Sequence, residues 1–156
     1  MQGTEPALYP LVGPLVMNPE VLKQNMNYPF KTTEHFVWYI AMNGHSVIGF
    51  VPVEHRGKEY IINNYYVTHK DREVLMQLLS RMLLDHLEKL PHRVECQEQH
   101  EGAETVFAHS FYRDKPTLSL GYKLTAICLK EDVECFRTLG FVVQRTWARY
   151  IKLTIE

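Results

Sequence analysis

The sequence predicts a single α/β domain, and three observations support that prediction. Residues 36–67 contain three strand-like runs separated by short turns, and one long amphipathic helix follows from Asp71. A short helix near the end of the chain closes at Gly140. A chain of 156 residues, 46% of them hydrophobic, can bury one sizeable core. We therefore expect one domain over 1–156, with residues 1–33 forming an N-terminal strand and helix ahead of the core.

Charge and composition exclude several classes of partner. Seventeen basic residues against eighteen acidic ones give a net charge of −1, which does not favour nucleic acid. No apolar run approaches the roughly 20 residues that cross a bilayer, and the first residues lack the features of a secretory signal. The three cysteines have no metal-ligand spacing. We expect a reduced, cytoplasmic protein with no metal, no nucleic acid and no membrane partner.

The N-terminal region is rich in turn formers. Leu8 to Val16 is a short apolar stretch, and its prolines predict an edge strand because they would interrupt a central ladder. Asn18-Pro19 reads as a helix start, with asparagine at the cap and proline in the first turn. This helix is expected to run to about Met26 and to bury Val21, Leu22 and Met26.

Three strands of an antiparallel meander are expected next. They are Phe36–Met42, Ser46–Val53 and Tyr60–Val67. The pair Asn43-Gly44 separates the first two and is a strong hairpin signal, since both positions of such a turn take positive φ. Gly49 suggests a bulge in the second strand. Residues 55–58 form the turn into the third.

The long helix from Asp71 to about Lys89 is the clearest element. Six apolar residues recur at helical period and form one wide stripe: Val74, Leu75, Leu78, Leu79, Met82 and Leu83. Pro91 ends it. Two runs after the long helix, residues 93–97 and Leu124–Leu129, are alternatives for the strand that follows it. Between them, Ala103 to Tyr112 has a weakly helical pattern. We favour Leu124–Leu129, because it leads directly into the short helix Glu131–Leu139, which Gly140 closes. Phe141–Ile155 is either one long strand or a tight pair.

The start of the long helix is a candidate anion site. A helix N-terminus carries unpaired amide N–H groups and a partial positive charge. Lys70 and Arg72 lie there and could donate charge-assisted hydrogen bonds to a phosphate. The alternative is that both are solvated turn residues before an ordinary core helix, and spacing alone favours this alternative.

Two fragments, together with the order of elements, resemble the GNAT-type N-acetyltransferases. The fragments are Tyr65-Tyr66-Val67 running into Arg72, and residues 136–141, Phe-Arg-Thr-Leu-Gly-Phe, which are similar to the family's terminal Tyr-x-x-Leu-Gly-Phe. The resemblance covers residues 34–156. It implies a mixed, mainly antiparallel sheet with helices on both faces, and a gap beside the third meander strand in which acetyl-CoA lies. The cofactor-binding residues that it implies are Tyr65, Tyr66, Val67, Lys70, Arg72, Glu73 and Val74.

Three positions depart from the family pattern. The phosphate turn of the family resembles Arg-Gly-x-Gly-x-Gly or Ala, but Glu73, Leu75 and Gln77 stand at the glycine positions. Glycine lets a backbone approach phosphate closely, and Glu73 adds a negative charge. The tyrosine used as general acid falls at Phe136. The glutamate used as base is replaced by asparagine, at Asn63 or Asn64.

The candidates that remain for proton transfer lack a motif. His69 and Asn64 are the candidates near the expected gap, with Glu95 or a water chain as further bases. Tyr112 or Tyr122 could replace the missing phenol. The resemblance implies an acyl-CoA-dependent N-acyltransferase that acts on a small-molecule or peptide amine, with acetyl-CoA as co-substrate. The departures favour an alternative, a catalytically inactive domain of the same origin that binds a partner or a small molecule. A homodimer through the last strand stays open.

Overall fold

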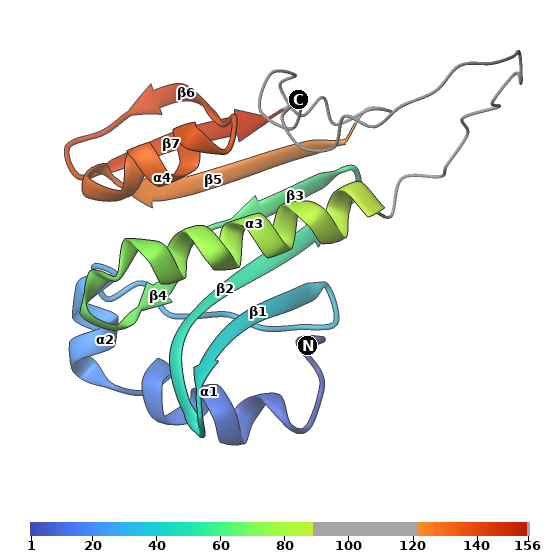
Figure 1. Ribbon diagram of the computed structural model, residues 1–156, viewed down its shortest axis with the longest axis vertical. Coiled ribbons are helices and arrows are strands. Elements are labelled where there is room, and N and C mark those ends of the chain that lie inside the picture. The colour runs from blue at the N-terminus through green and yellow to red at the C-terminus, as the bar shows by residue number, and fades with distance from the viewer. Residues whose placement is uncertain (89–121, 156) are drawn as a thin grey trace, which may run out of the picture.

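The computed structural model describes residues 1–88 and 122–155, which form a mixed α/β structure around one sheet (Figure 1). The strands of the described chain are β1 (Phe36–Asn43), β2 (Ser46–Arg56), β3 (Glu59–Ile62), β4 (Tyr66–Val67), β5 (Lys123–Leu129), β6 (Val142–Thr146) and β7 (Tyr150–Ile155). They form a seven-stranded sheet of order β1-β2-β3-β5-β7-β6, with β4 paired to β2. Only β3 and β5 pair in parallel; the other pairs are antiparallel. The expected fold class is confirmed.

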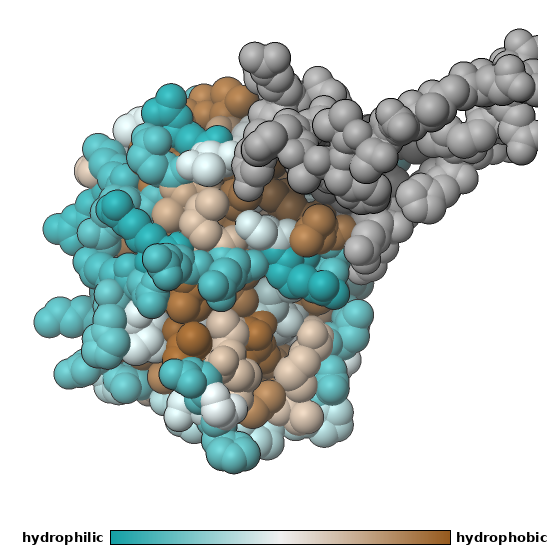
Figure 2. Space-filling view, in the orientation of Figure 1, coloured by the Kyte–Doolittle hydropathy of each residue, from teal (hydrophilic) through white to brown (hydrophobic). Residues whose placement is uncertain are grey.

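Helices cover both faces of this sheet. The described helices are α1 (Leu8–Val16), α2 (Pro19–Gln24), α3 (Arg72–Glu88) and α4 (Val133–Thr138), with short 3-10 turns η1 (Thr68–Lys70) and η2 (Lys130–Asp132). None of them is long and apolar enough to cross a membrane. On one face, α3 and α4 pack on the main core, which includes all six residues of the predicted apolar stripe. The outward side of α3 is a hydrophilic band in Figure 2.

The second face carries a smaller core at the other end of the sheet. Leu8 and Val12 of α1 pack against Phe36, Trp38 and Phe50 of β1 and β2. The expected edge strand over Leu8–Val16 is therefore wrong: this stretch is a helix. Its apolar residues recur every three or four positions, and that stripe outweighs the prolines. In Figure 1, α1 and α2 lie at the β1–β2 end of the sheet, away from β6 and β7.

The helix expected from Asn18 is confirmed at its start and is shorter than expected at its end. The Asn18 side chain accepts a hydrogen bond from the Glu20 amide at 2.8 Å, and Pro19 is the first helical residue. The helix ends at Gln24, and Met26 has a positive φ of 55° and an exposed side chain. The expected burial of Met26 is wrong, whereas Val21 is buried.

The meander differs from its expected outline in two places. The β1–β2 turn is Gly44-His45, because Asn43 pairs with Ser46, and positive φ occurs at Gly44 and not at Asn43. The expected strand over Tyr60–Val67 is interrupted: β3 ends at Ile62, and β4 begins only at Tyr66. The expected irregularity near Gly49 is confirmed, since the β1–β2 register shifts between Ala41 and Met42.

The C-terminal elements follow the favoured expectation. The next described strand after the long helix is β5, in parallel register with β3 from Glu59–Lys123 to Ile62–Ala126. The short helix ends with Leu139 as its cap and Gly140 at a φ of 93°. The last stretch is the strand pair β6–β7. The alternative strand at 93–97 and the weak helix Ala103–Tyr112 lie outside the described residues.

Candidate functional site

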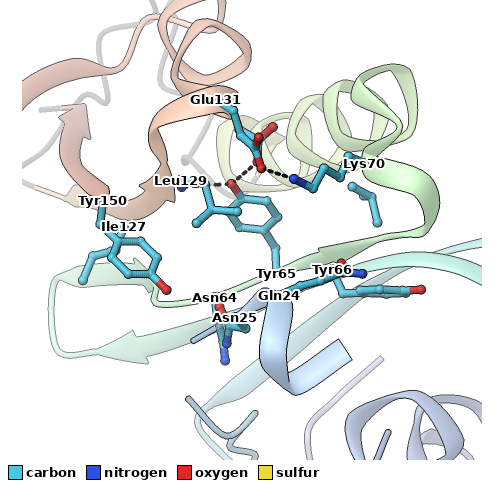
Figure 3. Close-up of a pocket in the computed structure, with 12 residues that line it drawn as sticks. Gln24, Asn25, Asn64, Tyr65, Tyr66, Lys70, Ile127, Leu129, Glu131 and Tyr150 are labelled. Carbon is cyan, nitrogen blue, oxygen red and sulfur yellow. Dashed lines mark hydrogen bonds and ion pairs between the residues drawn. The ribbon is translucent and has the colours of Figure 1, made fainter. Parts of the chain in front are cut away.

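The described strands leave a gap between β4 and the end of β5. The β3–β5 pairing stops at Ile62 and Ala126, after which the chain turns away so that β4 pairs with β2. A cavity of about 150 Å³ lies there (Figure 3). It is lined by Gln24, Asn25, Asn64, Tyr65, Tyr66, Val67, Lys70, Ile127, Leu129, Glu131, Asp132 and Tyr150. The gap that the resemblance implied is therefore present, but it is small.

Tyr65 accounts for the small size of the gap, because its side chain reaches across it. The Tyr65 hydroxyl donates to Asp132 Oδ2 at 2.5 Å and accepts from the Leu129 amide at 3.2 Å. Burial, then the negative charge of Asp132, hold the pKa of Tyr65 well above its usual value. Burial also raises the pKa of the Asp132 carboxyl, although the hydrogen bond from Tyr65 opposes that shift. The phenol therefore keeps its proton and connects the two sides of the gap.

Tyr65 also brings a phenol close to the position where the family's tyrosine is missing. Phe136 on α4 is fully buried, and its ring lies 5.7 Å from the ring of Tyr65 between centroids. The resemblance implied that Tyr65 binds the cofactor and gave no role to its hydroxyl. The contacts of this hydroxyl were not predictable, because Tyr65 and Asp132 lie 67 residues apart and Asp132 belongs to no motif.

The first amides of α3 are occupied by a side chain of the same turn. Asp71 Oδ1 accepts hydrogen bonds from the amides of Glu73 at 2.9 Å and Val74 at 3.3 Å. These are two of the N–H groups that a helix start offers to an anion. Leu75, at the second glycine position of the family turn, is fully buried in the main core. A bound diphosphate would have to displace one carboxylate and lie beside another, that of Glu73.

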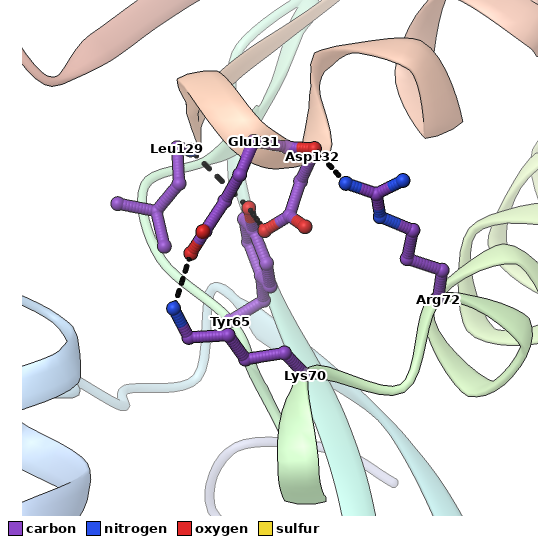
Figure 4. Close-up of polar contacts among 6 residues, drawn as sticks. All are labelled: Tyr65, Lys70, Arg72, Leu129, Glu131 and Asp132. Atoms are coloured by element: carbon purple, nitrogen blue, oxygen red, sulfur yellow. Dashed lines mark hydrogen bonds and ion pairs between the residues drawn. The ribbon is translucent and has the colours of Figure 1, made fainter.

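The two basic residues of this turn contact η2 (Figure 4). Lys70 Nζ lies 2.8 Å from Glu131 Oε1, and Arg72 Nη2 donates to the Glu131 carbonyl oxygen at 2.8 Å. The Lys70 ion pair is exposed, so it contributes little to stability. His69 and Lys70 both have a φ of 54°, a backbone conformation that residues other than glycine rarely adopt. The residues present at this turn therefore do not fit the diphosphate of CoA.

The other predicted site residues are divided between the gap and the surface. Asn64 is buried, lines the cavity and donates to the Pro29 carbonyl oxygen at 3.4 Å. Tyr66 lines the cavity and also packs on Phe50. His69 is exposed and does not line the cavity. Tyr122 stacks on Tyr60, next to the first residue of β5 and so at the end of that strand away from the gap.

Two of the sequence candidates lie outside the described residues, and two cysteines lie in the core. Tyr112 and Glu95 fall outside the part of the chain that the structure describes. Burial raises the pKa of the Cys128 thiol to about 12, and Cys135 is buried nearby, so both behave as small core residues. Within residues 1–88 and 122–155, no group of three or more His, Cys, Asp or Glu could hold a metal ion.

Comparison with known proteins identifies the fold. No protein-family model and no curated protein sequence matches the chain. Among solved structures, Escherichia coli ElaA has a TM-score of 0.66 at 10% identity, over 100% of this chain and 96% of that chain. An acyl-CoA N-acyltransferase from Pseudomonas aeruginosa has a TM-score of 0.61 at 12% identity, over 96% and 90%. A GNAT family acetyltransferase from Elizabethkingia anophelis, solved with acetyl-CoA bound, has a TM-score of 0.53 at 15% identity, over 100% and 94%. At these identities, the similarity shows the fold alone.

Proposed function

We propose that this chain, which has the fold of the GNAT-type N-acetyltransferases, is a ligand-binding domain that does not hold CoA by its diphosphate. One observation carries the proposal: the Asp71 carboxylate occupies the amides of Glu73 and Val74 at the start of α3. In the family that the sequence resembles, this turn is the place where the diphosphate is gripped. Here the chain itself supplies the anion.

Binding of a diphosphate at this turn would exchange one anion, the Asp71 carboxylate, for another. Displacing Asp71 removes a helix cap, which costs about 1 kcal/mol. A displaced carboxylate about 4 Å from a phosphate charge would add up to about 4 kcal/mol of repulsion at an effective dielectric constant of 20. Glu73 adds a second like charge to the same turn. The diphosphate, which normally anchors CoA, would therefore gain little or nothing at this site.

The gap itself supports the binding part of the proposal. It combines apolar side chains with polar atoms from Asn64, Tyr65 and Asp132. Small-molecule sites have this character, with a few placed polar groups in a mainly apolar cavity. We infer that a ligand without a diphosphate, or a segment of a partner protein, enters here.

The experiment compares two thioesters, of which only the second carries the 3′-phosphoadenosine diphosphate of CoA. S-acetylpantetheine and acetyl-CoA are titrated into the protein by calorimetry and by ligand-observed NMR, up to millimolar concentration. We expect acetyl-CoA to bind no more tightly than S-acetylpantetheine. An affinity for acetyl-CoA at least about tenfold higher, that is about 1.4 kcal/mol, would show that the diphosphate end of CoA contributes to binding and would refute the proposal.

A second candidate function is N-acyl transfer, and the retained gap between β4 and β5 favours it. The family's reaction needs such a gap, and the Tyr65 phenol lies within it. Acetyl transfer to a panel of amines, measured by release of free thiol, tests this candidate. Turnover that is abolished when Leu129→Trp fills the gap would establish it, and no turnover with either thioester would remove it.

A further inference from the structure

A second hollow lies on the opposite face of the sheet from α3 and α4. In Figure 1, α1 and α2 lie at the other end of the sheet, beside β1 and β2. It is a groove of about 530 Å³. Its lining residues are Glu59, Ile61, Asn63, Thr125, Ile127, Gln144, Arg145, Trp147 and Lys152. Every one of them comes from β3, β5, β6, β7 or the short connections that follow β3 and β6, so no described helix contributes to the groove.

An irregularity in β6 brings polar side chains to this groove. The β6–β7 register shifts between Val143 and Arg145, which leaves Gln144 as an extra residue. Such bulges often redirect a side chain towards a functional site. Trp147 follows β6, and its amide donates to the Tyr150 carbonyl oxygen at 2.8 Å. Gln144, Arg145 and Trp147 thus form one wall, opposite the strands β3 and β5.

Two cations of the groove face each other across the strand pair β6–β7. Arg145 and Lys152 are direct partners in the β6–β7 register, and both line the groove. Like charges directly opposite each other destabilise a sheet. Within the described residues, neither of them forms an ion pair with a carboxylate. Arg145 instead lies over the Trp147 ring, 5.3 Å from its centroid. This arrangement carries an energetic cost that a bound anion would remove.

The one carboxylate in the groove is already engaged. Thr125 Oγ1 donates to Glu59 Oε1 at 2.6 Å. Glu59 forms no ion pair with Lys152 or Arg145 among the described residues, so it does not neutralise them. The remaining lining is apolar or uncharged, with Ile61, Ile127 and the Trp147 ring as its apolar surface.

We propose that this groove binds a small organic carboxylate. The carboxylate lies between Arg145 and Lys152, which supply charge-assisted hydrogen bonds. The apolar part of the ligand lies against Ile61, Ile127 and the ring of Trp147. The inference goes beyond the proposed function, because it concerns a groove other than the gap between β4 and β5, and it does not depend on the turn at Asp71.

The test uses the fluorescence of Trp147 and NMR chemical shifts with defined probes. Trp147 is 39% exposed, whereas the only other tryptophan, Trp38, is 3% exposed. Benzoate, phenylacetate and indole-3-propionate are titrated beside benzamide and phenylacetamide, which keep the ring and lose the charge. Inorganic phosphate is titrated as a simple anion. We expect saturable binding of carboxylates, with the amides at least about tenfold weaker, as loss of hydrogen bonds to charged groups predicts.

Matched variants locate the binding. Lys152→Gln and Arg145→Gln should each weaken carboxylate binding about tenfold. Lys23→Gln changes the charge equally on the exposed surface of α2 and should leave binding unchanged. Because Lys152→Gln also removes a like-charge contact, it should raise the melting temperature of the free protein. This variant therefore remains folded for the titration.

Three results would overturn the proposal. The first is absence of saturable binding for every carboxylate of the panel. The second is equal binding of the amides, or equal weakening by Lys23→Gln, either of which would show that the two cations do not recognise the ligand. The third is binding of phosphate as tightly as the carboxylates, which would indicate a general anion site. Failure of the acetyl-CoA comparison leaves these outcomes unaffected, so the two proposals can fail separately.

Discussion

Replacing Asp71 by alanine should lower the stability of the protein and raise its affinity for acetyl-CoA. In the structure, this carboxylate accepts hydrogen bonds from two amides at the start of α3. Losing such a cap costs about 1 kcal/mol of unfolding free energy. For a chain of 156 residues, this corresponds to a fall in melting temperature of about 2–4 °C. The same change frees both amides and removes a negative charge, so affinity for acetyl-CoA should rise at least about fivefold.

Two further variants separate the cap from the charge. Asp71→Asn keeps an acceptor at the cap, so it should retain most of the stability while the charge is lost. Asn18→Ala removes the equivalent cap of α2, where the side chain accepts from Glu20 at 2.8 Å. It should also lower the melting temperature, but it should leave the affinity for acetyl-CoA unchanged. Differential scanning fluorimetry gives the melting temperatures, and ligand-observed NMR detects millimolar affinities.

The reasoning would be refuted in either of two ways. An unchanged melting temperature for Asp71→Ala would show that the carboxylate does not cap α3 in solution. A normal loss of stability without any gain in acetyl-CoA affinity would show that the cap is not what keeps the diphosphate out. In the second case, the buried Leu75 and the contacts of Lys70 with η2 would become the explanation.

Three other perturbations test the packing around the gap. Tyr65→Phe removes the hydroxyl that contacts the Leu129 amide and the Asp132 carboxylate. Urea unfolding should show a loss of unfolding free energy of about 1–3 kcal/mol, and a loss below about 0.5 kcal/mol would contradict this prediction. Burial raises the pKa of Asp132, so the folded state binds its proton more readily than the unfolded state. The unfolding free energy should then fall as the pH rises from about 3.9 through the pKa of Asp132 in the folded state. At pH 7, Asp132→Asn should therefore be more stable than the unmodified protein. If the two proteins gave superimposable profiles of unfolding free energy against pH, the shift in the Asp132 pKa would be refuted. Gly49→Ala would place a methyl group 3.0 Å from Val74 Cγ1 and should lower the unfolding free energy by about 1–3 kcal/mol. Gly13→Ala, whose added methyl group meets no atom within 4 Å, should raise it by about 0.5–1 kcal/mol. Equal changes in melting temperature for the two variants would rule out the close contact at Gly49.

The parts of the fold that sequence predicted are those fixed by local periodicity. The apolar stripe of α3 and the glycine that ends the short C-terminal helix each express one rule over a few residues. Leu8–Val16 was predicted wrongly because two local rules conflict there. Prolines argue against regular structure, whereas the apolar spacing indicates a helix face, and packing on Phe36 and Trp38 decides in favour of the helix.

The location of the candidate site could be predicted from the sequence, but the contacts within it could not. The resemblance implied a gap beside Tyr65 to Val67, and a cavity lies there. The hydrogen bonds of the Tyr65 hydroxyl join residues 64 and 67 positions apart, and no local sequence pattern predicts them. The interruption between β3 and β4 was missed for the same reason, since the pairing of β4 with β2 depends on Gly49 and on the approach of α3.

The parallel pairing of β3 with β5 also has a kinetic consequence. Ile62 and Ala126 are partners in that ladder, so the chain must close a long loop before the two parts of the sheet meet. Loop closure costs conformational entropy before any contact compensates for it, and such pairings form late. We expect the hairpins of residues 36–67 and α3 to form first, and β5, β6 and β7 to dock afterwards. The hydrogen bond from Tyr65 to Asp132 would then form only in the last step, so the gap would be assembled at the end of folding.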